Sequence, residues 1–401
     1  MIVSEEIENK KIAKQYKELL QVSYQTLSND DKKLIRSAFD TAVHAHRNQR
    51  RKSGEPYIYH PIGVAKIVAQ EIGLDATSIA AALLHDVVED TEYSFEDIEK
   101  LFGSDIRKIV EGLTKISKLS KENNVSLQAE NFRKLLLTLN DDIRVIIIKI
   151  ADRLHNMQTL DAMPDEKQIK IASETLYIYA PISHRIGLYN IKTELEDLSF
   201  KYTESNSYDT IKNKIEQSKE EQDLYIKSFS EIIQFALAEE GLEYQIKGRS
   251  KSIFSINHKM KVQNIPFENI FDKFAIRIVY KATHRNEKFL AWKIYSIVTD
   301  HFIPNPTRLR DWITSPKSNG YEALHITVMG PDNKWVEVQI RSERMNEIAE
   351  KGYAAHHKYK HGEHKDIGID SWLDKLQEVL ESNTENPVDF VENFKLNLYA
   401  K

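Results

Sequence analysis

The periodicity of the sequence changes at Gly241, and this change limits the folds that the chain can adopt. Before Gly241, apolar residues such as Ile62, Ala65 and Val68 recur at intervals of three and four, which predicts helices. After it, strand-like stretches at 243–247, 274–280, 323–329 and 334–341 alternate with helical stretches at 251–263, 287–301 and 342–352. The chain is therefore predicted to be multidomain, with an all-α half followed by an α+β domain with a mixed sheet.

Two segments of the helical half differ from the rest. Residues 195–240 are charged, with apolar residues at helical intervals, and are predicted to form a helical connecting bundle that ends at Gly241. Residues 115–130 are polar and contain Asn123 and Asn124, so a mobile loop is expected there.

The composition is that of an ordinary globular protein. The 401 residues are 41% hydrophobic and 29% charged, which is enough for two or three domains. The absence of cysteine excludes disulfides and thiolate metal sites. The net charge of −5 argues against a general coating of nucleic acid. No apolar run approaches the roughly 18 residues of a membrane helix, so we expect a cytoplasmic protein that does not span a membrane.

Four residues with metal-binding chemistry lie in or beside predicted helices of the first half: His60, His85, Asp86 and Asp152. His60 precedes Pro61, a favoured first helical residue. Two imidazoles and two carboxylates from separate helices would form a mixed nitrogen and oxygen site that suits Mn²⁺, Fe²⁺ or Zn²⁺. The alternative is that each histidine is a hydrogen-bonded core residue.

A second acidic pair, Glu89 and Asp90, follows His85 and Asp86 by one helical turn and is expected on the same helix face. Carboxylates beside a metal can orient or deprotonate a water molecule, as a hydrolase requires. The alternative for this pair is a polar helix end.

Acidic and basic residues also mark two predicted strands of the second half. The strand from Trp335 to Arg341 alternates without a fault, and a second strand begins near Asp272. Asp272 and Glu337, on neighbouring strands, could hold Mg²⁺ against a nucleoside triphosphate. Basic residues that could contact phosphates are plentiful nearby: Arg249, Lys251, Lys259, Arg277, Arg308, Arg310, Lys317 and Arg341. The alternative is that the polar side of these strands faces solvent.

Several long segments resemble the long RelA/SpoT homologues, the bifunctional (p)ppGpp synthetase/hydrolases of the bacterial stringent response. The resemblance runs from about Ser37 to Tyr399. In the first half it rests on Arg51–Pro61, Leu83–Thr91 and Ile150–Met157, and in the second on Gly248–Ile253, Phe271–Arg277, Pro316–His325 and Glu337–Arg341.

The resemblance implies an architecture with defined limits. It implies an all-α HD-type hydrolase domain at 1–195, a helical connecting region at 196–240 and an α+β, nucleotidyltransferase-like synthetase domain at 241–380. A tail at 381–401 would lead to a regulatory region beyond this chain. We expect the chain to be the catalytic half of a longer protein, although a naturally short form is the alternative.

For the first half, the resemblance implies Mn²⁺ bound by His60, His85, Asp86 and Asp152, with Glu89 and Asp90 assisting hydrolysis. Further residues would bind the substrate, the phosphates through Arg51 and Lys52 and the nucleoside through Asn156 and Thr159.

For the second half, it implies that Asp272 and Glu337 act with Mg²⁺ and that Glu337 helps to activate the attacking hydroxyl. Tyr321 would stack on the guanine of the acceptor nucleotide. The other residues expected to bind ATP or the acceptor are Arg249, Lys251, Lys259, Arg277, Arg308, Arg310, Lys317, Asn319, His325, Gln339 and Arg341.

The implied function is hydrolysis of (p)ppGpp to GDP or GTP plus pyrophosphate, and its synthesis from ATP and GDP or GTP. Ribosomes or other regulators would act only through the region beyond this chain, and the sequence leaves the oligomeric state open. Three alternatives stay open: a hydrolase whose second domain only senses nucleotide, a non-catalytic scaffold, and an HD-type nucleotidase for other phosphoesters.

Overall fold

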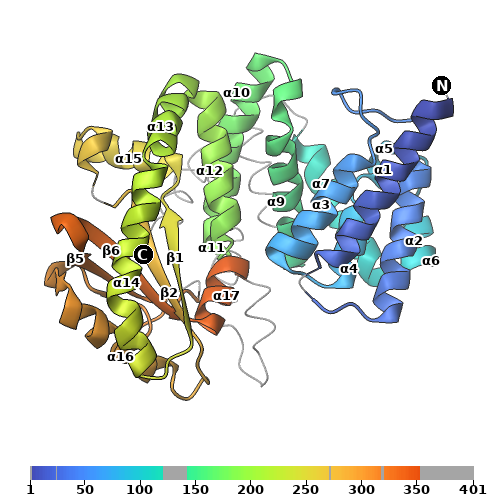
Figure 1. Cartoon of the computed structure of the whole chain (residues 1–401). Helices are drawn as coiled ribbons and strands as arrows, with labels where there is room; N and C mark the ends of the chain where they lie inside the picture. Colours follow the sequence, from blue (N-terminus) through green and yellow to red (C-terminus); the bar gives the residue numbers. More distant parts are fainter. Residues whose placement is uncertain (1, 24, 121–141, 271, 318–319, 353–401) are drawn as a thin grey trace, which may run out of the picture. The chain divides into compact units, whose positions relative to one another are not determined.

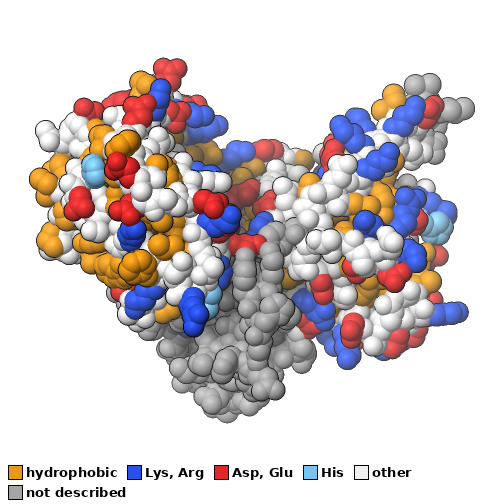
Figure 2. Space-filling view, turned by 60° about the horizontal axis from the view of Figure 1, so that its bottom comes forward, with side chains coloured by type: hydrophobic (Ala, Val, Ile, Leu, Met, Phe, Trp, Pro, Cys, Tyr) orange, Lys and Arg blue, Asp and Glu red, His pale blue; other side chains and the backbone are white. Residues whose placement is uncertain are grey.

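The computed structural model describes residues 2–23, 25–120, 142–270, 272–317 and 320–352 (Figure 1). The chain forms two compact units, of which the first contains Met1–Arg185 and the second Ile186–His356. No helix in these ranges is both long and apolar enough to cross a membrane. On the face seen in Figure 2, acidic and basic side chains are interspersed, as expected from 61 acidic and 56 basic residues.

The first unit is helical, as predicted. Its only pairing of extended backbone among the described residues is an isolated bridge between Arg50 and Pro56. Its α-helices are α1 (Ile2–Gln21), α2 (Asn29–Ala45), α3 (Tyr59–Lys66), α4 (Ala76–Leu84), α5 (Val87–Asp90), α6 (Phe95–Phe102), α7 (Ser104–Ser120), α9 (Ile143–Gln158), α10 (Asp165–Glu174) and α11 (Ala180–Arg185). Short π-helical segments extend α3 (Ile67–Ile72) and join α10 to α11 (Thr175–Tyr179).

Helices α4 and α9 form the centre of this unit because they are apolar on nearly all sides. The side chain of Asp75 caps α4 by accepting a hydrogen bond from the backbone N–H of Ser78, and every residue of α4 but Thr77 is buried. Asp142 caps α9 in the same way, through the N–H of Arg144. Helix α3 packs against both α4 and α9.

Three local predictions for this unit were wrong. Residues 115–120 continue helix α7 instead of forming a loop, since Ile109, Leu113 and Ile116 extend the helical spacing; residues 121–130 lie outside the described ranges. Helix α3 begins at Tyr59, two residues before Pro61. Helix α4 ends at Leu84, so His85 and Asp86 lie between two helices and do not share one continuous helix with Glu89 and Asp90.

The second unit contains helices and one mixed sheet. Its helices are α12 (Tyr189–Thr203), α13 (Ser205–Gln217), α14 (Lys219–Glu239), α15 (Ile253–Gln263), α16 (Glu287–His301) and α17 (Glu343–Lys351). Its strands are β1 (Tyr244–Ser250), β2 (Phe274–Tyr280), β3 (Ile303–Pro304), β4 (Arg310–Asp311), β5 (Leu324–Met329) and β6 (Trp335–Ser342).

The strand order is β1-β2-β6-β5-β3, and β4 pairs with β5. Strands β2 and β6 are parallel and the other pairs are antiparallel, which confirms the mixed sheet. Helices α14 and α16 cover one face, where Phe229 and Ile294 join the apolar residues of the strands in a single core (Figure 1). Helix α17 also packs against β2 and β6, and Arg277 of β2 donates a hydrogen bond to Glu350 of α17.

The predicted helices at 195–240 are confirmed as α12, α13 and α14, and they are part of the second unit, in which α14 packs against the sheet. The four predicted strands and three predicted helices that follow are present within a few residues of their expected limits, whereas the short strands β3 and β4 were missed. The predicted domain limits remain predictions, and the tail at 381–401 lies outside the described residues.

The polar side of β6 does not face solvent. Gln339 has 6% and Arg341 1% of its surface exposed. The alternative of a solvated polar face is therefore wrong for Gln339 and Arg341, whereas the side chain of Glu337 is 32% exposed.

Candidate metal and nucleotide sites

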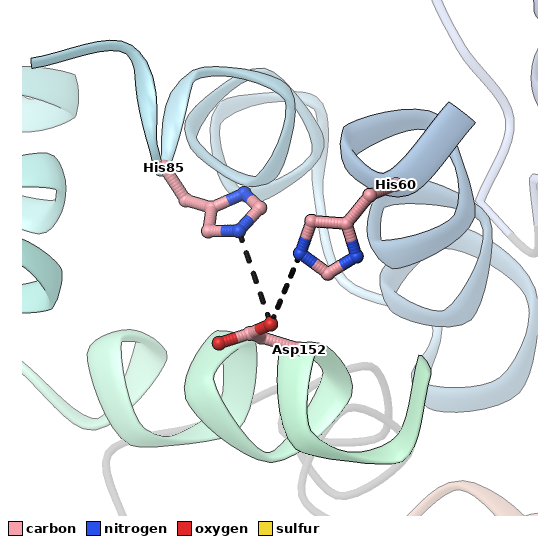
Figure 3. A group of neighbouring side chains, drawn as sticks. All are labelled: His60, His85 and Asp152. Carbon is pink, nitrogen blue, oxygen red and sulfur yellow. Dashed lines mark ion pairs between the residues drawn. The ribbon is translucent and has the colours of Figure 1, made fainter. Parts of the chain in front are cut away.

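Three side chains of the first unit converge on one point (Figure 3). His60 belongs to α3, His85 follows α4 and Asp152 belongs to α9. The Nε2 atom of His60 lies 3.1 Å and that of His85 4.0 Å from Oδ1 of Asp152. One ligand atom from each residue lies within 4.8 Å of the others, and all three residues are buried. The packing of α3, α4 and α9 thus brings together groups that are up to 92 positions apart in the sequence.

Asp86, the fourth predicted ligand, adjoins this group. Its Oδ2 lies 3.0 Å from Nε2 of His85 and 3.7 Å from Nε2 of His60. The hydroxyl of Tyr57 donates to the same oxygen at 2.7 Å and lies 3.2 Å from Oδ2 of Asp90. Tyr57 therefore links the carboxylates of Asp86 and Asp90, and Asp90 lies at the edge of the histidine cluster.

Opposite charges hold this cluster together. Burial opposes a positive charge on His85, but Asp86 and Asp152 outweigh it and raise the pKa of His85 to about 9. Burial dominates at His60 and lowers its pKa. Burial also opposes ionisation of Asp152, yet Lys149 and the histidines hold its pKa well below the usual range. Both carboxylates are therefore ionised at neutral pH, as ligands of a cation must be.

The donor set fits a divalent metal ion. The Nε2 atom of His85 is buried and has no hydrogen-bond partner in the described part of the chain, although it faces the oxygens of Asp86 and Asp152. In the absence of a metal, a proton on this nitrogen pairs with Asp86, and a divalent cation between nitrogen and carboxylate could take the place of that proton. Two imidazoles with carboxylate oxygens are ligands that first-row divalent metals accept.

A ring of hydrogen bonds surrounds the cluster. Lys149 donates to Oδ2 of Asp152 at 2.7 Å, and the amide of Asn156 donates to Oδ1 at 2.6 Å. The Nδ1 atoms of His155 and His60 are 2.9 Å apart. Arg51 reaches Nδ1 of His155 at 3.4 Å and donates to Oδ1 of Asn156 at 3.0 Å. Burial, together with the charges of His60 and Arg51, lowers the pKa of His155 to about 3.

The remaining residues predicted for this site lie at its edge. Lys52 is exposed, and Thr159 is exposed with its hydroxyl donating to the backbone of His155. Glu89 is half-buried in α5. Their roles toward substrate stay predictions.

In the second unit, Asp272 precedes β2 and lies between two lysines. Lys251 donates to its Oδ2 at 2.6 Å, and Lys259 contacts its Oδ1. Burial opposes ionisation of Asp272, but the two lysines outweigh it and lower its pKa to about 2. The backbone N–H of Lys251 donates to the carbonyl of Lys273, which fixes the start of α15 against the start of β2.

Glu337 begins a chain of polar contacts across β6 and β5. Its Oε1 lies 3.3 Å from Nδ1 of His325 and accepts a hydrogen bond from Gln339 at 2.7 Å. Burial opposes ionisation of Glu337, but His325 and Gln339 outweigh it and lower its pKa to about 2. Arg341 donates to Oε1 of Gln339 at 2.7 Å and to the hydroxyl of Tyr321 at 2.8 Å. That hydroxyl lies 2.7 Å from Nε2 of His325, so these five side chains form a closed ring of polar contacts.

Tyr321 is 9% exposed and packs edge-on against the rings of Tyr189 and Trp312. The Nζ atom of Lys317 lies 4.0 Å from the centre of the Trp312 ring and 5.2 Å from that of Tyr321. Stacking of Tyr321 on guanine stays a prediction, and the buried ring means that a base could reach its face only if neighbouring side chains move.

The other predicted phosphate ligands are distributed over the same unit. Arg249 is exposed on β1, opposite Ala275 of β2. Arg308 and Arg310 are exposed near β4. Arg277 is half-buried on β2, and burial with the charge of Arg341 lowers its pKa to about 10. Asn319 lies outside the described residues.

Sequence reasoning missed the residues that support the ligands. Lys149, His155 and Tyr57 were not predicted to take part, although each lies three residues from a predicted ligand in the sequence. Such an interval within a helix places two side chains on one face, and for Lys149 and His155, which share α9 with Asp152, this was a usable signal. Trp312, beside Lys317 and Tyr321, was missed because no local pattern connects it with the polar strand.

Two protein-family models match the chain. Residues 38–189 match the HD domain, and residues 248–364 match the region found in RelA and SpoT proteins. The first range contains the histidine and aspartate cluster, and the second contains the acidic strands. The fold and the sites thus define a two-domain chain with an HD domain followed by a RelA/SpoT region.

Comparison with characterised proteins gives the same result over most of the chain. It is 43% identical over 376 residues to a GTP pyrophosphokinase of Myxococcus xanthus, which covers 92% of this chain and 49% of that protein. It is 40% identical over 388 residues to the bifunctional (p)ppGpp synthase/hydrolase SpoT of Escherichia coli, with 96% and 54% covered. The chain belongs to the RelA/SpoT family, and it spans about half the length of the curated relatives that it matches.

Among solved structures, one described as a metazoan orthologue of SpoT that hydrolyses ppGpp is 32% identical. It covers 44% of this chain and 97% of its own, with a TM-score of 0.36.

Proposed function

We propose that the chain carries two opposed activities in guanosine 3′-pyrophosphate metabolism. The first unit would hydrolyse (p)ppGpp to GDP or GTP plus pyrophosphate with Mn²⁺, and the second would synthesise (p)ppGpp from ATP and GDP or GTP with Mg²⁺. The observation that carries the proposal is the presence of both acidic sites: the cluster of His60, His85 and Asp152, and the ionised carboxylates of Asp272 and Glu337.

Each metal ion, when bound, would polarise phosphoryl oxygens and neutralise the charge that develops on them. His60, His85, Asp86 and Asp152 would hold the first ion, and Asp272 and Glu337 the second. The metal preferences are part of the proposal and follow the family resemblance.

In the hydrolysis, a water oxygen bonds to the phosphorus that carries the 3′-oxygen, and the bond to that oxygen breaks. The 3′-oxygen leaves with a proton, and pyrophosphate is released. Asp90 and Glu89 would accept the proton of the water, and the hydroxyl of Tyr57 holds Asp90 beside the metal ligand Asp86. Arg51 and Lys52 would contact the phosphates, and Asn156 and Thr159 the nucleoside.

In the synthesis, the 3′-hydroxyl of GDP or GTP attacks the β-phosphorus of ATP, the bond between the α- and β-phosphates breaks, and AMP leaves. Glu337 would accept the hydroxyl proton; its low pKa keeps it ionised and able to do so. The Nε atoms of Arg277 and Arg341 are buried without a partner among the described residues, and a phosphate oxygen could pair with them only if neighbouring side chains move.

The other predicted contacts belong to this proposal: Arg249, Lys251, Lys259, Arg308, Arg310 and Gln339 toward ATP or phosphates, and Lys317, Asn319, Tyr321 and His325 toward the acceptor nucleotide. Because these substrates are nucleotides of the cytoplasm, we propose that the protein acts there.

Separate incubations test both activities. The chain is incubated with ATP and GDP in Mg²⁺, and separately with ppGpp in Mn²⁺ or Mg²⁺, and the nucleotides are separated by ion-exchange chromatography. His85→Ala should abolish hydrolysis and spare synthesis, whereas Asp272→Asn should do the reverse. Loss of both activities in either folded variant would contradict the two-site proposal. Unchanged nucleotides in all incubations would contradict it entirely.

A further inference from the structure

One guanidinium group contacts the supports of two metal ligands at once. The side chain of Arg51 reaches Nδ1 of His155 at 3.4 Å through one terminal nitrogen and Oδ1 of Asn156 at 3.0 Å through the other. His155 in turn contacts His60, and Asn156 contacts Asp152. Arg51 therefore begins two short series of polar contacts. The first runs through His155 to His60, and the second through Asn156 to Asp152, so each chain ends on a predicted metal ligand.

The first chain supports the form of His60 that binds a metal. An imidazole whose Nε2 binds a cation carries its proton on Nδ1. The Nδ1 atom of His60 then donates to Nδ1 of His155, 2.9 Å away, which must carry a lone pair. Arginine can only donate hydrogen bonds, so Arg51, 3.4 Å from the same nitrogen, favours that lone pair.

The opposite nitrogen of the same ring faces the carboxylates. Nε2 of His60 lies 3.1 Å from Oδ1 of Asp152 and 3.7 Å from Oδ2 of Asp86. A cation among these three atoms would accept a lone pair from each. Arg51 and His155 are therefore arranged to support His60 as a metal ligand.

The second chain fixes the amide of Asn156 by the same reasoning. Its Oδ1 accepts from Arg51, so its nitrogen must face Oδ1 of Asp152, which is 2.6 Å away. Lys149 donates to the other oxygen of Asp152 at 2.7 Å. Both oxygens of this carboxylate thus have a fixed partner, which sets the rotation of the group.

The space for this arrangement depends on a glycine in α3. A Cβ atom at Gly63 would lie 2.1 Å from Nε2 of His155. Any other residue at this position would push the imidazole away from His60. Gly63 lies one helical turn after His60, so α3 supplies both the ligand and the cavity for its supporting ring.

We propose that Arg51 is a positioning residue of the metal site, which through His155 and Asn156 supports the metal-binding form of His60 and fixes the orientation of Asp152. The inference rests on the proposed metal-dependent function of the first unit. It assigns Arg51 a role that is present before substrate binds, in addition to any contact with phosphate.

The test measures Mn²⁺ affinity of the whole chain without nucleotide, from the electron paramagnetic resonance signal of free Mn²⁺. Loss of a group that supports a metal ligand typically weakens affinity about 10- to 100-fold, and this is expected for Arg51→Met and His155→Leu. His155→Gln, which restores an acceptor, should recover most of the affinity, and Gly63→Ala should weaken binding. Arg47→Met is the matched control: it removes an exposed arginine of the same unit, and affinity should stay within about twofold of the unaltered chain.

A second readout is rescue by a conservative variant. Arg51→Lys keeps a donor but cannot contact His155 and Asn156 through two nitrogens at once, so its Mn²⁺ affinity should lie between those of Arg51→Met and the unaltered chain. Circular dichroism verifies that each variant is folded, and Gly63→Ala and His155→Gln keep the test valid should Arg51→Met not fold.

The outcomes separate this inference from the proposed function. If the unaltered chain neither binds Mn²⁺ nor hydrolyses ppGpp, the proposed function fails. If it does both, but Arg51→Met binds Mn²⁺ as tightly as the unaltered chain, the positioning role of Arg51 is refuted while the function stands.

Discussion

Replacing Arg344 with methionine should destabilise the second unit strongly. Arg344 of α17 forms paired hydrogen bonds of 2.8–3.0 Å with Glu287 at the start of α16 and with Glu322 ahead of β5. The side chains of Glu287 and Glu322 are only 5% and 18% exposed. Ser342 also donates to Glu287 at 2.7 Å. The guanidinium of Arg344 thus neutralises the carboxylates of Glu287 and Glu322, and these contacts connect α17 with the start of α16 and with the segment before β5.

The magnitude follows from what remains after the substitution. Removing one partner of a buried ion pair leaves an uncompensated charge and typically destabilises a protein by about 3–5 kcal/mol. With an unfolding slope of about 2 kcal/mol per molar urea, the midpoint should fall by roughly 2 M.

Tryptophan fluorescence during urea unfolding is a suitable assay, since Trp292, Trp312 and Trp335 all lie within Ile186–His356. Arg308→Met is the control, because Arg308 is exposed and such substitutions usually change stability by less than about 0.5 kcal/mol. A midpoint for Arg344→Met within the error of the control would refute the reasoning.

Three further predictions concern single positions. In EDTA, the stabilisation linked to His85, whose pKa is raised to about 9 in the folded protein, should be complete below about pH 6.5 and disappear as the pH rises through 9. Saturating Mn²⁺ should abolish this loss of stability, because the ion replaces the proton on His85. Calorimetric unfolding with a pH-independent midpoint in EDTA would contradict this prediction. Tyr321→Phe should lower the urea midpoint by the equivalent of about 1–3 kcal/mol, because buried Arg341 and His325 lose the hydroxyl between them, and an unchanged midpoint would oppose this. Gly352→Ala should destabilise the second unit, since φ is +56° and a Cβ would lie 2.6 Å from the carbonyl oxygen of Gly187; thermal unfolding at the unaltered temperature would count against it.

The sequence predicts the ligands of the first site well because each lies in a short motif with distinctive chemistry. His85 with Asp86, and Asp152 after an apolar run, can be recognised without knowing how the helices pack. Their supports cannot: Tyr57 reaches Asp86 and Asp90 only because the loop before α3 folds over the end of α4. Hydrogen-bond partners of this kind depend on tertiary packing, which local spacing does not encode.

The strands of the second unit were predicted from alternation, and β6 shows where that signal ends. Alternation correctly separates Val338 and Ile340 from Glu337 and Gln339, but it cannot reveal that Gln339 is buried. The two-residue strands β3 and β4 were missed because a pattern of period two needs more residues to be visible.

The parallel pairing of β2 with β6 makes the second site sensitive to insertions and deletions. Glu337 lies opposite Ala275 on one side and Thr327 on the other. Gaining or losing one residue within β6 would turn Glu337 and Gln339 into the apolar core and expose Val338 in their place. A change of equal length between β2 and α16 would leave every strand in phase. Natural variation in chain length should therefore accumulate in that connection, and β6 should vary by substitution alone.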